Sequence, residues 1–235
     1  MEVLAVAGLP EVRPGDDLAA LIAAAATLEP GDVVVVAQKV VSKAEGRLRD
    51  LREVTPSDRA LELAAKLDAD ARMLQVVLDE SVRVVRDERV LIVETAHGFV
   101  CANAGVDHSN IETPHTVTLL PLDPDASAAA LSERLGVPVI VSDTFGRPWR
   151  LGIVNVALGV AGLPGVVDLR GGRDDFGRAL TATVVAVADE LAAAAGLVMG
   201  KTSRVPVVVI RGYAAEGPAG TGADLIRPPE EDLFR

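Results

Sequence analysis

The chain has 235 residues and a mass of 24.4 kDa, and 49% of its residues are hydrophobic, 24% charged and 3% aromatic. This length allows one large domain or two small lobes around a buried core, and the high apolar content excludes a mainly disordered chain. The formal net charge of −11 argues against a nucleic-acid partner, because non-specific binding to DNA or RNA requires a basic surface.

In chain order, runs of β-branched residues and helical periodicities predict an alternating set of elements. These are strand 3–7, helix 17–26, strand 32–37, helices 57–67 and 72–79, strands 82–85 and 90–94, helix 124–135, strands 137–142 and 166–169, helix 181–199 and strand 205–210. Ser57 and Asp123, which precede two of the helices, are typical N-cap residues. Because strands 82–85 and 90–94 are adjacent, we expect an α/β fold with a mixed sheet and at least one antiparallel hairpin.

Several protein classes are disfavoured by simple features of the chain. A single cysteine, Cys101, excludes an internal disulfide, and its small apolar neighbours predict an inert buried thiol. The first residues contain no basic stretch, and the longest apolar run, 182–199, is interrupted by Asp189 and Glu190. We therefore expect a cytoplasmic protein without a membrane partner, built as a single unit over residues 1–235 with a loop-like tail at 215–235.

Common nucleotide-binding motifs are absent. Gly200-Lys201-Thr202 resembles the end of a P-loop, but Ala195 stands where the first glycine is required, and a helix precedes the segment instead of a strand. No Gly-x-Gly-x-x-Gly segment joins a strand to a helix. The fold is therefore predicted to be neither a P-loop nor a Rossmann domain.

Four polar segments contain residues that core packing does not need. They are Gly8-Leu9-Pro10-Glu11, 38–46, 101–110 and 142–150. Ligands gather at the carboxyl ends of strands in α/β sheets, and the two lysines of segment 38–46 suit a phosphate. Each segment alone is equally consistent with a solvated turn.

Asp107 and Asp143 are the candidate metal ligands. Each lies in one of these predicted loops, and Thr144 follows Asp143 directly. Carboxylate and hydroxyl oxygens suit Mg²⁺ or Mn²⁺, which take nucleotide phosphates and water as further ligands. We predict a shared metal–phosphate cluster, with Arg147 and Arg150 contacting phosphates or another anion. Either aspartate alone could instead cap a turn.

Taken in order, these segments resemble the coenzyme F420:L-glutamate ligase family from about Gly8 to Gly212. The matching motifs are Gly8-Leu9-Pro10-Glu11, Lys39-Val40-Val41-Ser42-Lys43, Ala104-Gly105-Val106-Asp107 with Ser109-Asn110, Pro121-Leu122-Asp123-Pro124-Asp125-Ala126-Ser127-Ala128, Asp143-Thr144 with Gly146-Arg147 and Trp149-Arg150, and Ala188-Asp189-Glu190-Leu191-Ala192. The resemblance implies a family-specific two-lobed α/β fold with interleaved lobes, and a homodimer.

The resemblance also implies an activity. Members of the family use GTP to add L-glutamate to the lactyl carboxylate of the coenzyme precursor F420-0, through an acyl phosphate and with GDP and phosphate as products, and then extend a γ-linked glutamate tail. Two Mg²⁺ or Mn²⁺ ions are implied, with K⁺ as a further cofactor. Carried over residue by residue, the implied GTP contacts are Leu9, Pro10, Glu11, Val12, Gln38, Lys43 and Asn110, with a further contacting loop at 198–204. The implied metal ligands are Asp107, Asp143 and Thr144, the two aspartates being the catalytic pair.

Two other functions use the same residue types. A metal-dependent phosphohydrolase would pass the phosphoryl group to water, and a non-catalytic GTP-binding sensor would respond to the nucleotide without turnover. The first predicts GTP loss without glutamate or coenzyme, and the second predicts binding with negligible turnover.

Overall fold

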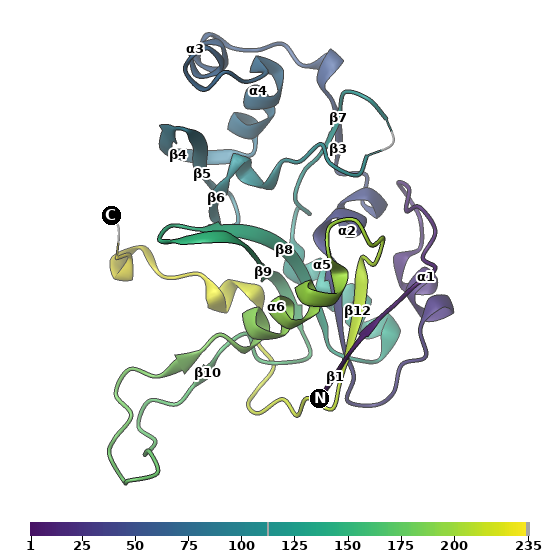
Figure 1. The fold of residues 1–235 in the computed structure, drawn as a ribbon, viewed down its shortest axis with the longest axis vertical. Coiled ribbons are helices and arrows are strands. Elements are labelled where there is room, and N and C mark those ends of the chain that lie inside the picture. The colour runs from purple at the N-terminus through teal and green to yellow at the C-terminus, as the bar shows by residue number, and fades with distance from the viewer. Residues whose placement is uncertain (112, 234–235) are drawn as a thin grey trace.

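The computed structural model describes residues 1–111 and 113–233. Its centre is a five-stranded sheet in the order β1-β12-β2-β8-β9 (Figure 1). The strands are β1 (Glu2–Ala5), β12 (Val207–Arg211), β2 (Val33–Ala37), β8 (Val139–Arg147) and β9 (Arg150–Ala161). Only β2 and β8 are parallel, and the other neighbours are antiparallel. The predicted mixed α/β architecture is confirmed.

Both faces of the sheet are buried because β2 is apolar at every position. Val34 and Val36 pack toward helices α1 (Leu18–Ala25), α2 (Gln38–Ala44) and α5 (Pro124–Leu135). Val33 and Val35 pack on the opposite face, against α6 (Val187–Met199). A strand covered by helices on both faces reads as a continuous hydrophobic run instead of an alternating one. The sheet is therefore the middle layer of three.

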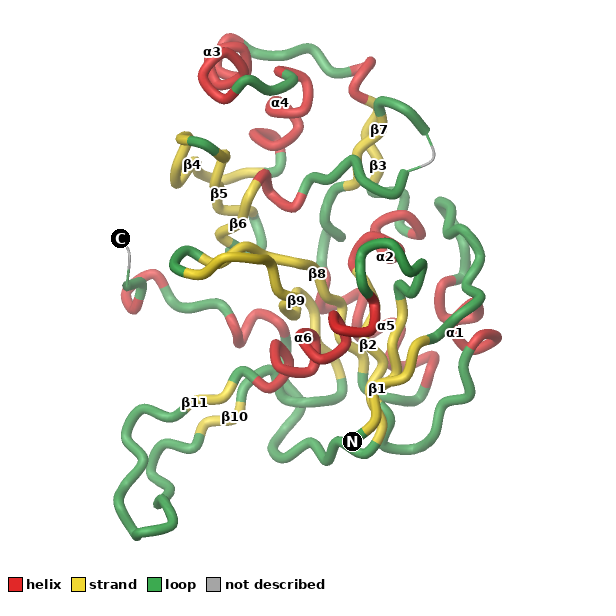
Figure 2. The backbone as a smooth tube through the Cα atoms, viewed as in Figure 1, coloured by secondary structure: helices red, strands yellow, loops and turns green. Residues whose placement is uncertain are grey.

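A second group of elements lies beyond the edge of this sandwich. Strands β4 (Ser81–Glu88), β5 (Val90–Thr95) and β6 (Val100–Ala102) form an antiparallel sheet, which packs with helices α3 (Asp58–Leu67) and α4 (Ala71–Asp79) (Figure 2). The β4–β5 pair is the predicted hairpin. Strands β3 (Leu48–Asp50) and β7 (Thr116–Thr118) form a two-stranded ladder beside it. A small cluster centred on Phe99, Cys101, Leu120 and Leu158 joins this group to the main sheet.

Short elements complete the chain. Strands β10 (Val167–Asp168) and β11 (Val184–Val185) begin a long excursion away from the body of the molecule (Figure 2). Single 3₁₀ turns occupy Leu51–Glu53, Asn103–Gly105, Gly222–Leu225 and Pro229–Glu231. The last two lie in the predicted loop-like tail. In the described part of the chain, no helix is long and apolar enough to span a bilayer.

The two predicted helix caps are confirmed. The side chains of Ser57 and Asp123 each accept a hydrogen bond from a backbone N–H of the first turn that follows, and Asp17 caps α1 in the same way. Such caps satisfy donors that have no partner within the helix. Asp123 is followed by Pro124 at the first helical position, where a missing N–H is harmless.

Three expectations about element type are wrong. Segment 38–46 was expected as a loop, but Gln38–Ala44 forms helix α2, because burial of Val41 in the core outweighs the low helix propensity of its valines. Segment 142–150 is not a loop either: β8 continues to Arg147 and turns directly into β9. The helix expected at 181–199 begins at Val187, since 181–186 holds the β-branched pair of strand β11.

Strand β9 was not predicted from the sequence, because glycines and polar residues interrupt its run of β-branched residues. At Gly159, a Cβ atom would lie 1.9 Å from the carbonyl oxygen of Pro124. This glycine therefore lets the start of α5 approach β9 at backbone contact distance. Packing between elements that are far apart in sequence sets the composition of this strand.

Candidate functional site

A cavity of about 810 Å³ opens at the carboxyl end of β2 and beside the middle of β8. Its walls come from the loop after β1, helix α2, the loop before β7, strands β8 and β9, and the loop after α6. All ten residues implied by the sequence resemblance line it: Leu9, Pro10, Glu11, Val12, Gln38, Lys43, Asp107, Asn110, Asp143 and Thr144. Segments that are more than 130 residues apart in the chain therefore meet at one site, with residues 198–204 contributing as well.

Helix α2 presents its polar side chains to this cavity. Lys39 and Lys43 are four residues apart and so lie on one helix face. The Lys43 ammonium pairs with the carboxylate of Glu11 and donates to the carbonyl oxygen of Asn110 at 2.9 Å. Lys43 is buried, and Glu11 is exposed. The helix thus connects the loop after β1 to the loop that carries Asp107.

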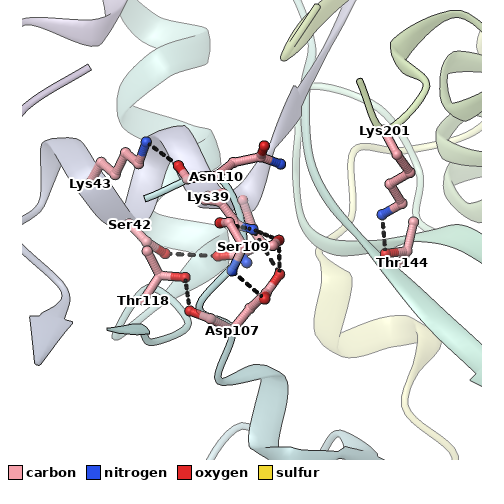
Figure 3. A network of polar contacts seen from close by, with 10 residues as sticks. Lys39, Ser42, Lys43, Asp107, Ser109, Asn110, Thr118, Thr144 and Lys201 are labelled. Atoms are coloured by element: carbon pink, nitrogen blue, oxygen red, sulfur yellow. Dashed lines mark hydrogen bonds and ion pairs between the residues drawn. The ribbon is translucent and has the colours of Figure 1, made fainter. Parts of the chain in front are cut away.

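Asp107 is held by a dense set of hydrogen bonds (Figure 3). Its carboxylate accepts from the Lys39 ammonium at 2.7 Å, and from the backbone N–H and hydroxyl of Ser109 at 2.8 and 2.7 Å. Its backbone N–H and C=O groups pair with those of Thr118, the last residue of strand β7. Burial opposes ionisation of this group, but the bonds from Lys39 and Ser109 outweigh it and lower the pKa of Asp107. Asp107 is therefore a positioned anion.

Asp143 has a different environment. Alternation along β8 places it on the face toward α2, with Thr144 on the face toward α6. Burial raises the pKa of the Asp143 carboxyl to about 6, and repulsion from Asp107 adds to this. The backbone N–H of Thr144 and the charges of Lys201 and Lys39 act in the opposite direction. Two carboxylates that repel each other at the edge of a cavity form a favourable place for a cation.

Thr144 lies on the other side of β8 from this carboxylate pair. Its hydroxyl accepts a hydrogen bond of 2.7 Å from the ammonium of Lys201, in the loop after α6 (Figure 3). Asn155 of β9 stands directly across the ladder from Thr144 and also lines the cavity. Of the residues that the structure describes, those that line this half of the cavity carry a hydroxyl, an amide and an ammonium, but no carboxylate.

The donor set fits one hard divalent cation. Asp107 and Asp143 supply carboxylate oxygens, the ligands that Mg²⁺ and Mn²⁺ take in proteins. Among the described residues, no three His, Cys, Asp or Glu side chains come together as a metal cluster. Two carboxylates are the usual protein share of a magnesium site, because phosphates and water complete its shell.

Basic side chains outnumber acidic ones in the cavity wall, although the whole chain is strongly acidic. The lining includes five basic residues, Arg13, Lys39, Lys43, Lys201 and Arg204, and three acidic ones, Glu11, Asp107 and Asp143. A basic cleft within an acidic protein concentrates anionic ligands at that one place. The local charge therefore favours a polyanion such as a nucleotide.

Sequence reasoning missed several members of this wall and proposed two that lie elsewhere. Arg13 and Asn155 line the cavity but were not predicted as site residues, whereas Arg204 is the last residue of the predicted contacting loop 198–204. Only the position of Arg13 next to a recognised segment could have indicated it. Arg147 and Arg150 sit at the end of the β8–β9 hairpin, are exposed, and are not among the lining residues. In the single chain, their predicted contact with phosphates finds no geometric support.

Cys101 matches its prediction. The thiol is buried between β6 and the β8–β9 pair. Burial, with the nearby Asp143 carboxylate as a lesser cause, raises its pKa to about 12. It is therefore an inert packing residue beside the cavity and not a nucleophile.

Comparison with known proteins identifies the same segments. Residues 8–212 match the profile of the family described as F420-0:Gamma-glutamyl ligase. A protein of Methanothermobacter thermautotrophicus named coenzyme F420:L-glutamate ligase is 47% identical over 250 residues, covering 100% of this chain and 99% of that protein. Proteins of the same name from Archaeoglobus fulgidus and Methanopyrus kandleri are 45% and 48% identical, covering 100% and 96% of this chain and 96% and 94% of those proteins.

Proposed function

Because this chain belongs to the F420-0:gamma-glutamyl ligase family, we propose that it is a GTP-dependent ligase in coenzyme F420 biosynthesis. Its substrates would be L-glutamate and the lactyl carboxylate of F420-0, with extension to a γ-linked glutamate tail. The observation that supports the proposal is the single cavity that collects all ten residues implied by the family resemblance.

The reaction requires an activated carboxylate, since joining a carboxylate to an amine is unfavourable in water. A carboxylate oxygen of F420-0 attacks the γ-phosphorus of GTP, and the bond to the β-phosphate oxygen breaks with its electron pair leaving on GDP. The amine of glutamate then attacks the acyl carbon of the resulting acyl phosphate. Inorganic phosphate leaves, and the amine loses its proton as the amide forms. The products are GDP, phosphate and the glutamylated coenzyme.

The residues of the cavity suit the first step. Phosphoryl transfer depends on positioning and on neutralising the phosphate oxygens, so basic side chains around the nucleotide carry most of the protein's contribution. Lys43 is fixed between Glu11 and Asn110 and would hold the nucleotide at the α2 wall. Leu9, Pro10 and Val12 would provide the apolar contacts, and Gln38 an amide.

Asp107 and Asp143 would hold a divalent cation, Mg²⁺ or Mn²⁺. Such a cation, when bound, neutralises charge on the transferred phosphoryl group. The separation of Asp107 and Asp143 onto different elements would align the nucleotide between α2 and β8. Potassium is proposed as a further activating ion, to be tested by replacing K⁺ with Na⁺ in the assay.

We also propose a homodimer. Strand β9 is a sheet edge, and its outer half carries Leu151 and Ile153 at 98% and 57% exposure. An exposed apolar edge strand is a favourable place for association. Light scattering coupled to size-exclusion chromatography should give twice the chain mass of 24.4 kDa, and a monomer at micromolar concentration would contradict this part of the proposal.

The experiment that tests the activity is mass spectrometry of F420-0 after incubation with the purified protein, GTP, L-glutamate and Mn²⁺. Each component is omitted in turn, and ATP replaces GTP in a parallel reaction. We expect a mass increase of one or more glutamyl units that requires both GTP and the metal. The number of added units gives the tail length directly.

The same experiment separates the two alternatives. Consumption of GTP with unmodified F420-0 would indicate a phosphohydrolase. Intact GTP and unmodified F420-0, from folded protein that binds the nucleotide, would indicate a sensor. Either outcome would refute the ligase proposal.

A further inference from the structure

We propose that the ammonium group of Lys201 takes the place of a second divalent cation beside Thr144, so that each chain binds one divalent cation with its GTP. This inference rests on the proposed function, because it assigns the groups that contact the transferred phosphate. It concerns the half of the cavity on the α6 side of β8.

The first observation is the contrast between two of the three lysines that line the cavity, Lys39 and Lys201. The Lys39 ammonium donates to the Asp107 carboxylate, to the carbonyl oxygen of Ser109 and to the Ser109 hydroxyl, at 2.7, 2.8 and 2.7 Å. An ammonium has three N–H donors, so Lys39 is saturated by the protein itself. It fixes Asp107 and has no donor left for a ligand.

Lys201 is the opposite case. In the described part of the chain its ammonium has one hydrogen-bond acceptor, the hydroxyl of Thr144 at 2.7 Å, and it forms no ion pair. Two N–H donors and the full positive charge therefore remain for a bound anion. Figure 3 shows Lys201 and Thr144 together, apart from the Lys39–Asp107–Ser109 cluster.

The second observation is the distribution of carboxylates. Three carboxylates occur among the described residues that line the cavity, and one of them, Glu11, is already paired with Lys43. Asp107 and Asp143 remain, and Asp143 points to the α2 side of β8. The α6 side offers Thr144 and Asn155, which are neutral. A divalent cation placed there would find no carboxylate ligand among the described residues and would meet the charge of Lys201 at the same hydroxyl.

An ammonium at this position can perform the work of a cation in phosphoryl transfer. The γ-phosphorus exchanges its bond to the β-phosphate oxygen for a bond to the carboxylate oxygen, while negative charge stays on its equatorial oxygens. Lys201 would donate its two remaining hydrogen bonds to those oxygens and would neither gain nor lose a proton. Lysine is a recurring point-charge ligand of phosphates.

The test is a count of bound Mn²⁺ by electron paramagnetic resonance. Mn²⁺ is titrated into the full-length protein saturated with β,γ-imido-GTP, whose terminal phosphoryl group is not transferred. The wild type is compared with Lys201→Gln, which removes the charge and adds a carbonyl ligand. Lys66→Gln is the matched control, because Lys66 is an exposed lysine of α3 that pairs with Asp87 far from the cavity.

We expect one Mn²⁺ per chain in the wild type and in Lys66→Gln, and two in Lys201→Gln. At Mn²⁺ concentrations that fill one site, kcat of Lys201→Gln should be about 100-fold below that of the wild type, and excess Mn²⁺ should restore part of the loss.

Two Mn²⁺ ions in the wild type would overturn the inference and leave the proposed function standing. A Lys201→Gln variant with unchanged kcat would overturn it as well. Absence of any nucleotide-dependent Mn²⁺ binding would refute the proposed function, and this inference with it. The wild-type count decides even if the variant does not fold.

Discussion

Replacing Gly196 by alanine should disturb the cavity indirectly, by displacing the lining residue Asn155. Gly196 lies inside α6 and does not have a left-handed backbone. A glycine is therefore needed here because there is no room for a side chain, and not because the backbone conformation requires it. A Cβ atom there would lie 2.8 Å from both Cγ and Oδ1 of Asn155. Asn155 lines the cavity opposite Thr144, so the displaced amide would move relative to that residue.

The expected magnitude follows from two opposing contributions. Alanine in a helix interior is about 1 kcal/mol more favourable than glycine. Overpacking of a well-packed site costs about 1–3 kcal/mol. Gly196→Ala should therefore lower the free energy of unfolding by roughly 0–2 kcal/mol. An Asn155→Ala background removes the contacts with Cγ and Oδ1 and leaves only the Asn155 Cβ at 3.2 Å, so the same substitution should raise the free energy of unfolding by up to about 1 kcal/mol.

A double-mutant cycle measures this coupling. The four proteins are the wild type, Gly196→Ala, Asn155→Ala and the double variant, compared by thermal and urea unfolding. The coupling free energy should be about 1–3 kcal/mol, which corresponds to roughly 2–12 °C in Tm for a chain of this size. In ligation kinetics, Gly196→Ala should raise KM for GTP more than it lowers kcat.

The result that would refute the reasoning is additivity. If Gly196→Ala changes the free energy of unfolding equally in both backgrounds, within about 0.5 kcal/mol, its Cβ does not meet Asn155. A stabilised Gly196→Ala variant with an unchanged KM would have the same meaning.

Three further predictions concern single residues. Asp143→Asn should lower metal-dependent kcat/KM at least about 100-fold while the protein still folds, as judged by circular dichroism, and normal turnover would refute the proposed role of Asp143 as a metal ligand. Asp32 is 1% exposed and accepts two hydrogen bonds of 2.8 Å from Arg211, which also pairs with Glu29, so Asp32→Asn should destabilise the protein by about 1–3 kcal/mol in urea unfolding. The Arg211 guanidinium lowers the pKa of Asp32 in the folded protein below its ordinary value of 3.8. The stability that ionised Asp32 contributes should therefore be complete above pH 3.8 and be lost as the pH falls through the lower pKa of the folded state. An acid-unfolding midpoint that is the same in Asp32→Asn as in the wild type would contradict this. Cys101 should react with a thiol reagent only after unfolding, because it is buried with a pKa of about 12, and fast labelling of the native protein would be inconsistent with this packing.

The sequence predicted the elements whose signal is local. The central strand β2 has an unbroken valine run, and Ser57 and Asp123 carry the capping chemistry that starts α3 and α5. Helix α2 and strand β9 were missed because their signals are not local. Val41 becomes helical by packing into the core, and Gly159 belongs to a strand because α5 approaches it.

The residues that line the candidate cavity were predictable from the sequence, but their arrangement was not. The family resemblance indicated Asp107, Asp143 and Thr144, but the sequence pattern predicted a loop at Asp143 and Thr144. In the structure, they occupy successive positions of β8 and so face opposite sides of the sheet. That alternation separates a carboxylate half of the cavity from a half served by Lys201, and only the strand register reveals it.

Motif residues outside the cavity explain how that register is held. Asp125 and Asp189 belong to segments that resemble the family, yet neither lines the cavity. Their carboxylates accept hydrogen bonds of 2.8 Å from the backbone N–H groups of Val160 and Ala157, and burial raises the pKa of Asp189. Because β9 is a sheet edge, these N–H groups would otherwise have no strand partner. The two aspartates therefore fix β9 just beyond Asn155, and these motif residues hold a wall of the cavity in place.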